Sequence, residues 1–187
     1  MTILSLIKRI PSYASDVKIN INSCFEKVPE KINKVQLYGI ALTAAYTLKQ
    51  EELLNDIRSE AKIYLEEADA MACKIAVIDI AARAILNSFA TVKESREEPF
   101  EHGMSFAMAD SINVEDVDIH LYYLTAATLL RCDKSVAFCI ERLNTLGLGD
   151  EEINFVVKLA ATLDAAEQAL DIETLRSYDF ITRESSF

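Results

Sequence analysis

The sequence predicts an all-α fold, and three observations support that class. The chain has 187 residues, 51% of them hydrophobic, which is enough for one buried core. Only 4 Gly and 3 Pro interrupt it, too few for the many turns of an all-β protein. Ala, Leu, Glu and Lys, which are strong helix formers, fill long unbroken segments. We therefore expect a single helical domain.

The first thirty residues predict an arm of two helices. A short apolar and basic helix covers residues 2–10 and ends at Pro11. Ser12 can then cap a helix over 13–27, because its hydroxyl can accept a hydrogen bond from a free backbone N–H. Apolar side chains recur every four residues along that helix, at Tyr13, Val17, Ile21 and Phe25.

Three more helices are expected before the middle of the chain. Residues 32–47 form an apolar helix, and the acidic turn after Gln50 begins the next, because carboxylates favour a helix N-terminus. That helix runs to about Leu65, and the longest helix covers 67–91. The apolar spacing is helical in both: Leu53, Ile57 and Ala61 in the shorter, and Met71, Ile75, Ile78, Ala82, Ile85 and Phe89 in the longer.

The second half begins with an irregular connector at 93–113, which holds a charge run, His102 and Pro99. Three helices follow, at 114–130, 134–146 and 151–170. Gly147 suits the end of the second of these helices, and Asp150 with Asn154 suits the start of the third. The tail at 171–187 is expected to begin as helix and then fray.

An internal repeat relates the two halves. The tetrapeptide Leu-Thr-Ala-Ala at 42–45 recurs at 124–127, an offset of 124 − 42 = 82. A Lys and three Ala at 74–82 recur at 158–166, an offset of 84. The order apolar helix, polar break, helix, long Ala-rich helix therefore occurs twice. We predict one domain with an arm (1–30), two half-repeats (32–92 and 114–170), a connector (93–113) and a tail (171–187).

The net charge of −11 and the absence of a basic cluster argue against nucleic-acid binding. No apolar run approaches the roughly 20 residues of a membrane span, so we expect no membrane association. The start of the chain lacks the pattern of a signal peptide, because its Lys-Arg pair follows the apolar patch. A reducing cytoplasm is the expected compartment. The cysteines and histidines lack metal spacing, so no metal or bound cofactor is expected.

The stretch from His120 to Gly147 is the one part that looks like a chemical site. It reads as a helix, a polar break and a second helix, with Cys132 in the break. A helix start flanked by Arg131 and Lys134 favours a thiolate, whereas Asp133 opposes it. Cys132 is therefore a candidate reactive thiol. The alternative is that Cys132 is a structural cysteine. Cys24 and Cys73 lie in apolar helical surroundings, and we interpret both as small buried hydrophobic residues.

Cys139 and Ser135 offer further, weaker chemistry. Cys139 lies seven residues after Cys132, about 10.5 Å along a helix, beyond the reach of a disulfide unless the break folds back. It otherwise fills apolar space. As a hydrolytic nucleophile, Ser135 would need a general base, which His120 on the preceding helix could supply. The simpler interpretation is that neither residue has a catalytic role. We interpret His102 and the three glutamates of the connector as solvated. These are Glu94, Glu97 and Glu98.

The segment 11–20, PSYASDVKIN, resembles the entry pattern P-x-Y-A-x-D-x-K-x-N of the alkyl hydroperoxide reductase D (AhpD) family. That family belongs to the alkylhydroperoxidase D-like (carboxymuconolactone decarboxylase-like) superfamily. The resemblance continues through LYGIALTAAYTLKQEELLNDI, on through Asn87, and over 120–170. It implies an AhpD-like all-α fold with a pseudo-repeat, and a homo-oligomer, usually a trimer.

The family site has the pattern E-x11-C-x-x-C-x3-H, usually with a second His two residues after the first Cys. Its dithiol cycles through a disulfide, reduces the peroxiredoxin AhpC and is recharged by dihydrolipoamide, while Glu and His relay protons. This chain departs from that pattern. The family positions, in order along the chain, are held by His120 (Glu), Cys132 (first Cys), Lys134 (His), Ser135 (second Cys) and Cys139 (distal His).

We therefore expect an AhpD-like antioxidant-defence protein whose redox site is degenerate, with residual thiol chemistry at most. The alternative is a non-catalytic helical oligomer that serves as an interaction or scaffold protein. Dihydrolipoamide would be a reductant, and an AhpC-type peroxiredoxin a partner, only if the family chemistry survives.

Overall fold

The computed structural model describes residues 3–94, 104–105 and 111–184, with side chains described up to Lys93 and again up to Leu175. Every regular element in these ranges is helical, which confirms the all-α class. The elements are α1 (Ile3–Arg9), the 3-10 turn η1 (Ser12–Ala14), α2 (Ser15–Glu26), α3 (Lys34–Leu48), α4 (Glu51–Ala61), α5 (Glu67–Glu94), α6 (Asp116–Leu129), α7 (Asp133–Thr145) and α8 (Asp150–Glu184).

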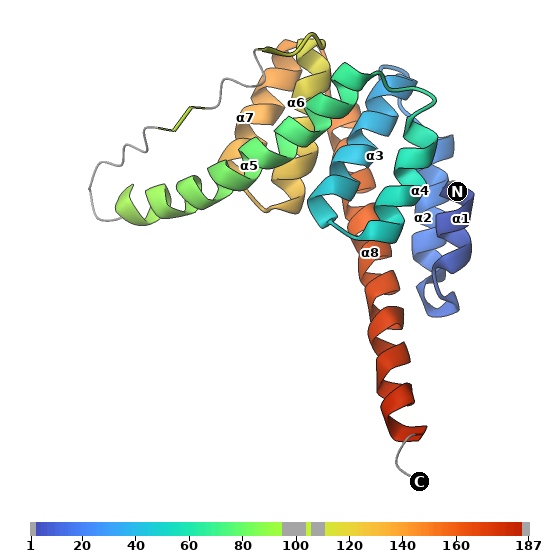
Figure 1. Ribbon diagram of the computed structural model, residues 1–187. Coiled ribbons are helices and arrows are strands. Elements are labelled where there is room, and N and C mark those ends of the chain that lie inside the picture. The colour runs from blue at the N-terminus through green and yellow to red at the C-terminus, as the bar shows by residue number, and fades with distance from the viewer. Residues whose placement is uncertain (1–2, 95–103, 106–110, 185–187) are drawn as a thin grey trace.

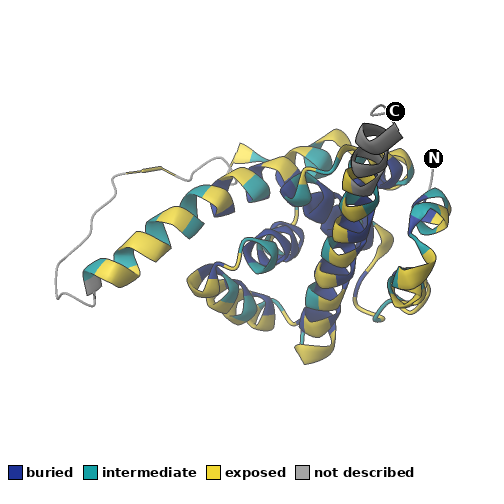
Figure 2. Cartoon of the chain, turned by 90° about the horizontal axis from the view of Figure 1, so that it is seen from below, coloured by how far each residue is buried: buried dark blue, intermediate teal, exposed yellow. Residues whose placement is uncertain are grey.

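Helices α3 and α6 form the centre of the molecule, packed on each other and on α5 and α8 (Figure 1). Both are apolar on all sides, and most of their residues are buried (Figure 2). A polar contact also joins them, because the side-chain amide of Gln36 donates a 2.7 Å hydrogen bond to Asp118. Burial raises the pKa of Asp118, and the Gln36 hydrogen bond opposes that rise.

The helix starts follow the order that the internal repeat predicts. Helices α6 and α7 begin 82 residues after α3 and α4 (116 − 34 and 133 − 51), and α8 begins 83 residues after α5 (150 − 67). The two non-glycine residues with positive φ among the described ones, Lys49 and Arg131, are also 82 apart and follow α3 and α6. The repeat itself stays a prediction, which superposition of the halves would test.

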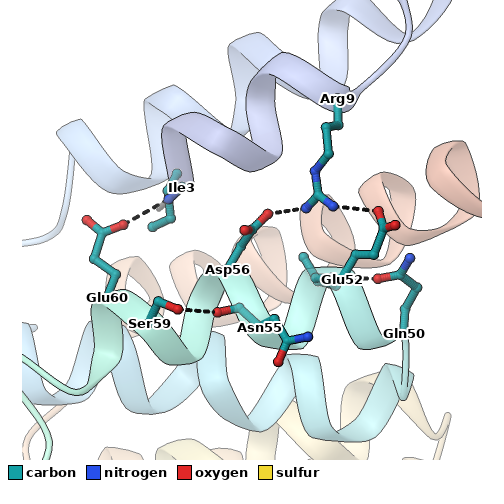
Figure 3. Close-up of polar contacts among 9 residues, drawn as sticks. Ile3, Arg9, Gln50, Glu52, Asn55, Asp56, Ser59 and Glu60 are labelled. Atoms are coloured by element: carbon teal, nitrogen blue, oxygen red, sulfur yellow. Dashed lines mark hydrogen bonds and ion pairs between the residues drawn. The ribbon is translucent and has the colours of Figure 1, made fainter. Parts of the chain in front are cut away.

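The N-terminal arm is held against α4 by charged side chains (Figure 3). Arg9 pairs with Glu52 and with the fully buried Asp56, and the backbone N–H of Ile3 donates to Glu60 at 2.9 Å. Ser12 does not act as the predicted cap: it lies in η1, and α2 follows Ala14 without a side-chain cap. Instead, Asn33 and Gln36 form a capping box at α3 that the sequence analysis missed.

Two helices are longer than predicted. Helix α8 continues to Glu184, through the tail that was expected to begin as helix and then fray, and it projects from the body (Figure 1). Asp150 is its first residue, and the backbone N–H of Gly149 donates to the Glu152 side chain. Helix α5 also projects beyond the body (Figure 2). Its exposed face carries apolar side chains. These are Met71, Ile78, Ile85, Phe89 and Val92, between 43% and 73% exposed, and we name them the α5 stripe.

By length and composition, α5 over Glu67–Lys93 could also cross a membrane, and 22% of its most apolar window is buried. This corrects the expectation that no apolar run approaches that length. The first half of α5 packs against α3 and α6, and a single helix that passes this test is weak evidence for a span.

Candidate functional site

The site lies where the chain turns from α6 into α7. Arg131 adopts the left-handed conformation, with φ 53°, and its N–H donates to the carbonyl of Thr128. The N–H of Cys132 donates to the carbonyl of Ala127 at 2.9 Å. Together these bonds form a Schellman motif, which satisfies the last carbonyls of α6 and reverses the chain. Cys132 consequently stands at the N-cap of α7.

Cys132 and Ser135 face each other across the first turn of α7. The Cys132 Sγ lies 3.1 Å from the Ser135 Oγ, and both side chains are buried. The side-chain amide of Asn87, from α5, donates to both atoms at 3.4 Å. A polar cluster of three residues from two helices therefore surrounds the thiol. We name it the Cys132–Ser135–Asn87 cluster.

Asn87 was not predicted as a site residue. The resemblance includes this position, but the role of Asn87 depends on how α5 packs on the start of α7, which is a contact between segments 45 residues apart. One signal was available: Asn87 is an amide in an apolar, Ala-rich part of the helix, where a polar side chain needs a partner.

Cys139 lies further along α7, buried and unpaired with any other thiol; all four cysteines are free. Burial raises the pKa of the Cys139 thiol to about 12, although nearby Arg83 opposes that rise. Such a thiol stays protonated at neutral pH and is a poor nucleophile. The structure thus favours the interpretation that Cys139 fills apolar space.

His120 and Lys134 stand outside the cluster. The Nδ1 of His120 lies 2.7 Å from the backbone carbonyl of Asp116, on its own helix, and its ring lies beside Tyr123 and Phe138. The contacts of the Ser135 hydroxyl are instead Cys132 and Asn87. The structure therefore does not bring His120 and Ser135 together as a base and its nucleophile. Lys134 is exposed at the start of α7.

Two cavities flank the cluster. One, of about 280 Å³, is lined by Ser135, by Arg83 and by the largely apolar side chains of Ile80, Tyr123, Phe138 and Cys139; we name it the Ser135 cavity. The other, of about 360 Å³, is lined by Cys132 together with Ala84, Ser88, Thr91, Val92 and Arg131; we name it the Cys132 cavity. Asn87 and Lys134 line both.

Within the described residues, no group of His, Cys, Asp and Glu side chains is arranged to hold a metal ion. His102, Glu97 and Glu98, and the side chain of Glu94, lie outside that part of the chain. The described site itself offers one thiol, Cys132, with two hydrogen-bonding neighbours.

The fold and the site are those of a helical protein with one thiol at a helix start, directly after a polar break. Comparison with known proteins shows which proteins this chain resembles. No protein-family model matches the chain. It is 25% identical over 167 residues to alkyl hydroperoxide reductase AhpD of Coxiella burnetii (strain RSA 493 / Nine Mile phase I), covering 88% of this chain and 94% of the relative. It is 27% identical over 184 residues to AhpD of Rhodospirillum centenum (strain ATCC 51521 / SW), covering 95% of each.

A third relative, AhpD of Corynebacterium kroppenstedtii (strain DSM 44385 / JCM 11950 / CIP 105744 / CCUG 35717), is 23% identical over 176 residues, which is 94% of this chain and 100% of the relative. The similarity is low in identity but extends over nearly the whole of each chain. Together with the all-α fold, these similarities support the assignment of the chain to an AhpD-like family.

Proposed function

We propose that this AhpD-like protein retains one-thiol redox chemistry at Cys132 and has lost the family's dithiol cycle. The observation that carries the proposal is the 3.1 Å contact between Cys132 Sγ and Ser135 Oγ at the start of α7. These residues occupy the two cysteine positions of the family pattern, so a hydroxyl stands where the second sulfur would be. Because a hydroxyl forms no disulfide, the cycle cannot close between these two positions.

The chemistry needs two external reactants, a hydroperoxide and a thiol. The Cys132 thiolate attacks one oxygen of the hydroperoxide, the O–O bond breaks, and the alkoxide leaves as the alcohol after it takes a proton from water. The sulfur, now oxidised to a sulfenic acid, condenses with the external thiol to give a mixed disulfide and water. A second thiol then releases Cys132; dihydrolipoamide supplies both thiols in one molecule. An AhpC-type peroxiredoxin is the proposed protein partner, and the cytoplasm the proposed compartment.

The proposed activity is weak, because the positions of the family's proton relay hold His120, Lys134 and Cys139. Of these, Cys139 is a buried thiol with a raised pKa, and His120 turns its Nδ1 to Asp116. General acid–base catalysis accelerates a reaction roughly 10²–10⁴-fold, and most of the residues that would provide it are absent here.

The direct test is hydroperoxide consumption with dihydrolipoamide as reductant, compared between the parent and Cys132→Ser. We expect slow turnover by the parent and none by the variant. Cys73→Ser is the matched control, because Cys73 is buried away from the site and its thiol pKa is raised to about 12. A parent without turnover, and with no Cys132 that reacts faster than the other three cysteines, would refute the enzyme proposal.

The α5 stripe favours a second candidate function, a non-catalytic oligomer with an interaction or scaffold role. Its five large apolar side chains are exposed and recur at helical spacing on one face of α5. That helix projects from the body (Figure 2). A face of that kind suits contact with another protein surface. A trimer is the favoured assembly, on the family resemblance. This candidate needs no turnover, so the assay above separates the two.

A further inference from the structure

The thiol and the hydroxyl of the cluster open onto different cavities. Cys132 lines the Cys132 cavity and not the Ser135 cavity, whereas Ser135 lines the Ser135 cavity and not the Cys132 cavity. Asn87 lies between them: it lines both cavities, and its amide donates to both Sγ and Oγ. The loss of one sulfur has therefore left the remaining thiol facing one particular side of the site.

The two cavities differ in chemistry. Ile80, Tyr123 and Phe138 give the Ser135 cavity a largely apolar and partly aromatic wall, to which Arg83 and Lys134 add charged side chains. The wall of the Cys132 cavity includes the hydroxyls of Ser88 and Thr91 and the charged side chains of Arg131 and Asp133. Small polar molecules suit such a wall, and long apolar chains suit the other cavity better.

We infer that Cys132 reacts with small polar reagents, such as hydrogen peroxide or short hydroxylated hydroperoxides, that reach it through the Cys132 cavity along α5. The inference deepens the proposed function and rests on it for the identity of the natural reagent. Asn87 contributes by donating a hydrogen bond from its side-chain amide to the sulfur, which holds the sulfur in place at the wall of this cavity. The Ser135 cavity, which faces the position of the family's second cysteine, does not serve this thiol.

Access to the thiol can be measured without any turnover. Iodoacetamide is a small polar probe: the thiolate carbon–sulfur bond forms as iodide leaves. The rate of Cys132 alkylation, located by mass spectrometry of peptides, would be compared between the parent and Ser88→Phe. Ser88 is exposed on α5 and lines the Cys132 cavity, so a phenyl ring there closes the route without entering the core.

Two variants serve as controls. Ser59→Phe makes the same change at an exposed position of α4, away from both cavities, and Phe138→Ala removes an exposed ring from the Ser135 cavity. We expect Ser88→Phe to slow Cys132 alkylation on the order of tenfold, as closing access to a reactive thiol should. Each control should change the rate less than about twofold, because neither changes the wall that Cys132 faces.

An unchanged rate in Ser88→Phe, or a faster rate in Phe138→Ala, would overturn the inference, because the reagent would then arrive by another route. Failure of the proposed function looks different. If the parent shows no peroxide turnover while Ser88→Phe still slows alkylation, the access route stands and the enzyme proposal fails.

Discussion

At Gly39 the ring of Tyr122 occupies the place where a side chain would begin. A Cβ built on Gly39 would lie 2.2 Å from the Tyr122 Cε1, far inside contact distance, and both residues belong to the central helices α3 and α6. Tyr122 is fully buried, so its ring has little room to move. This close approach explains a glycine in the middle of a helix, where it otherwise costs stability.

Gly39→Ala should therefore destabilise the fold by about 3 kcal/mol, the upper part of the usual range for overpacking a core. Urea unfolding of the parent and the variant measures the difference. Gly149→Ala is the matched control, because a Cβ there would meet only the Glu152 side chain, at an ordinary 3.6 Å. If the two variants unfold alike, the packing described for α3 and α6 is wrong.

Ser135→Cys should restore the missing sulfur. The Oγ of Ser135 already lies 3.1 Å from the Cys132 Sγ, so a small rotation of either side chain brings two sulfurs within bonding distance. We expect the variant to form an intramolecular disulfide under mild oxidant, detected by mass spectrometry after alkylation. The parent and Ser59→Cys, which places a thiol far away on α4, should not form it. Gain in peroxidase activity should be weak, because the proton relay remains absent.

A Ser135→Cys protein that keeps both thiols free after oxidation would contradict the alignment of this stretch with the family pattern.

Part of the site was predictable from the sequence, because Cys132 and Ser135 are neighbours on one helix turn and their spacing is local. Asn87 and the Gly39–Tyr122 contact were not, because each joins helices that are distant in the sequence, and no local pattern encodes which faces meet.

Among the elements, the end of α3 depends on a residue in an unfavourable conformation. Lys49 has a φ of 63°, in the left-handed region where an L side chain costs about 1 kcal/mol and glycine does not. Lys49→Gly should therefore stabilise the protein by up to about 1 kcal/mol, measured by thermal unfolding. Lys62→Gly is the control at the end of α4, where φ is −56°. At Lys62 glycine relieves no strain and only adds conformational freedom to the unfolded chain, so Lys62→Gly should destabilise the protein. Destabilisation by Lys49→Gly as well would refute the explanation given for Lys49.

Helix α1 depends on a charge pair that stabilises a buried carboxylate. Burial raises the pKa of Asp56, and Arg9 opposes that rise through its charge and hydrogen bond. Arg9→Leu would leave the carboxylate unpaired and should destabilise the protein by about 3 kcal/mol at neutral pH, the lower end of the range for a broken buried pair. Glu52→Gln, which removes the exposed partner, should cost less than about 1 kcal/mol.

The Arg9→Leu defect should depend on pH in a fixed direction. A carboxyl whose folded pKa is above its unfolded value binds protons more readily in the folded state, so its contribution to stability falls as pH rises through that window. The loss in Arg9→Leu should thus be smaller at about pH 5 than at about pH 7.5. Urea unfolding at both values measures it, and an equal loss would mean that Asp56 does not carry the unpaired charge.

Element positions were largely predictable, because Pro11 and Gly147 mark real helix ends and the apolar spacing is strong. The tail was expected to begin as helix, and α8 runs on through it to Glu184 for a physical reason. No Gly or Pro follows Gly149, so nothing in the chain stops the helix, and solvent exposure alone does not. The helical spacing in α5 was also a poor guide to its buried face. That helix has apolar residues on both sides, and spacing identifies a helix without showing which side is covered.

The whole molecule is a core of packed helices from which α5 and α8 project (Figure 1). The fold class followed from composition, but the position of α3 and α6 at the centre only becomes clear from their packing. Their uniform apolarity indicates burial without indicating partners. In α5, by contrast, one side meets α3 and α6, while the α5 stripe on the other side is between 43% and 73% exposed.

We propose that the α5 stripe is covered by further copies of the chain. Met71, Ile78, Ile85 and Val92 recur every seven residues, a spacing that keeps one face of a helix toward a partner helix. Light scattering should then give a multiple of the 20.9 kDa chain mass, with a trimer favoured. Ile85→Glu places a charge at the most exposed residue of the α5 stripe and should shift the measured mass to that of the monomer.

Ile19→Glu is the matched control for that experiment, because Ile19 is similarly exposed, at 64%, but lies on α2, away from the α5 stripe. It should leave the mass unchanged. The two variants also distinguish specific association through α5 from nonspecific association of exposed apolar residues. Nonspecific association would be reduced by either glutamate, whereas association through α5 would be reduced only by Ile85→Glu. A parent mass near 20.9 kDa at micromolar concentration would refute the oligomer, and an Ile85→Glu protein that still associates would place the interface on another face.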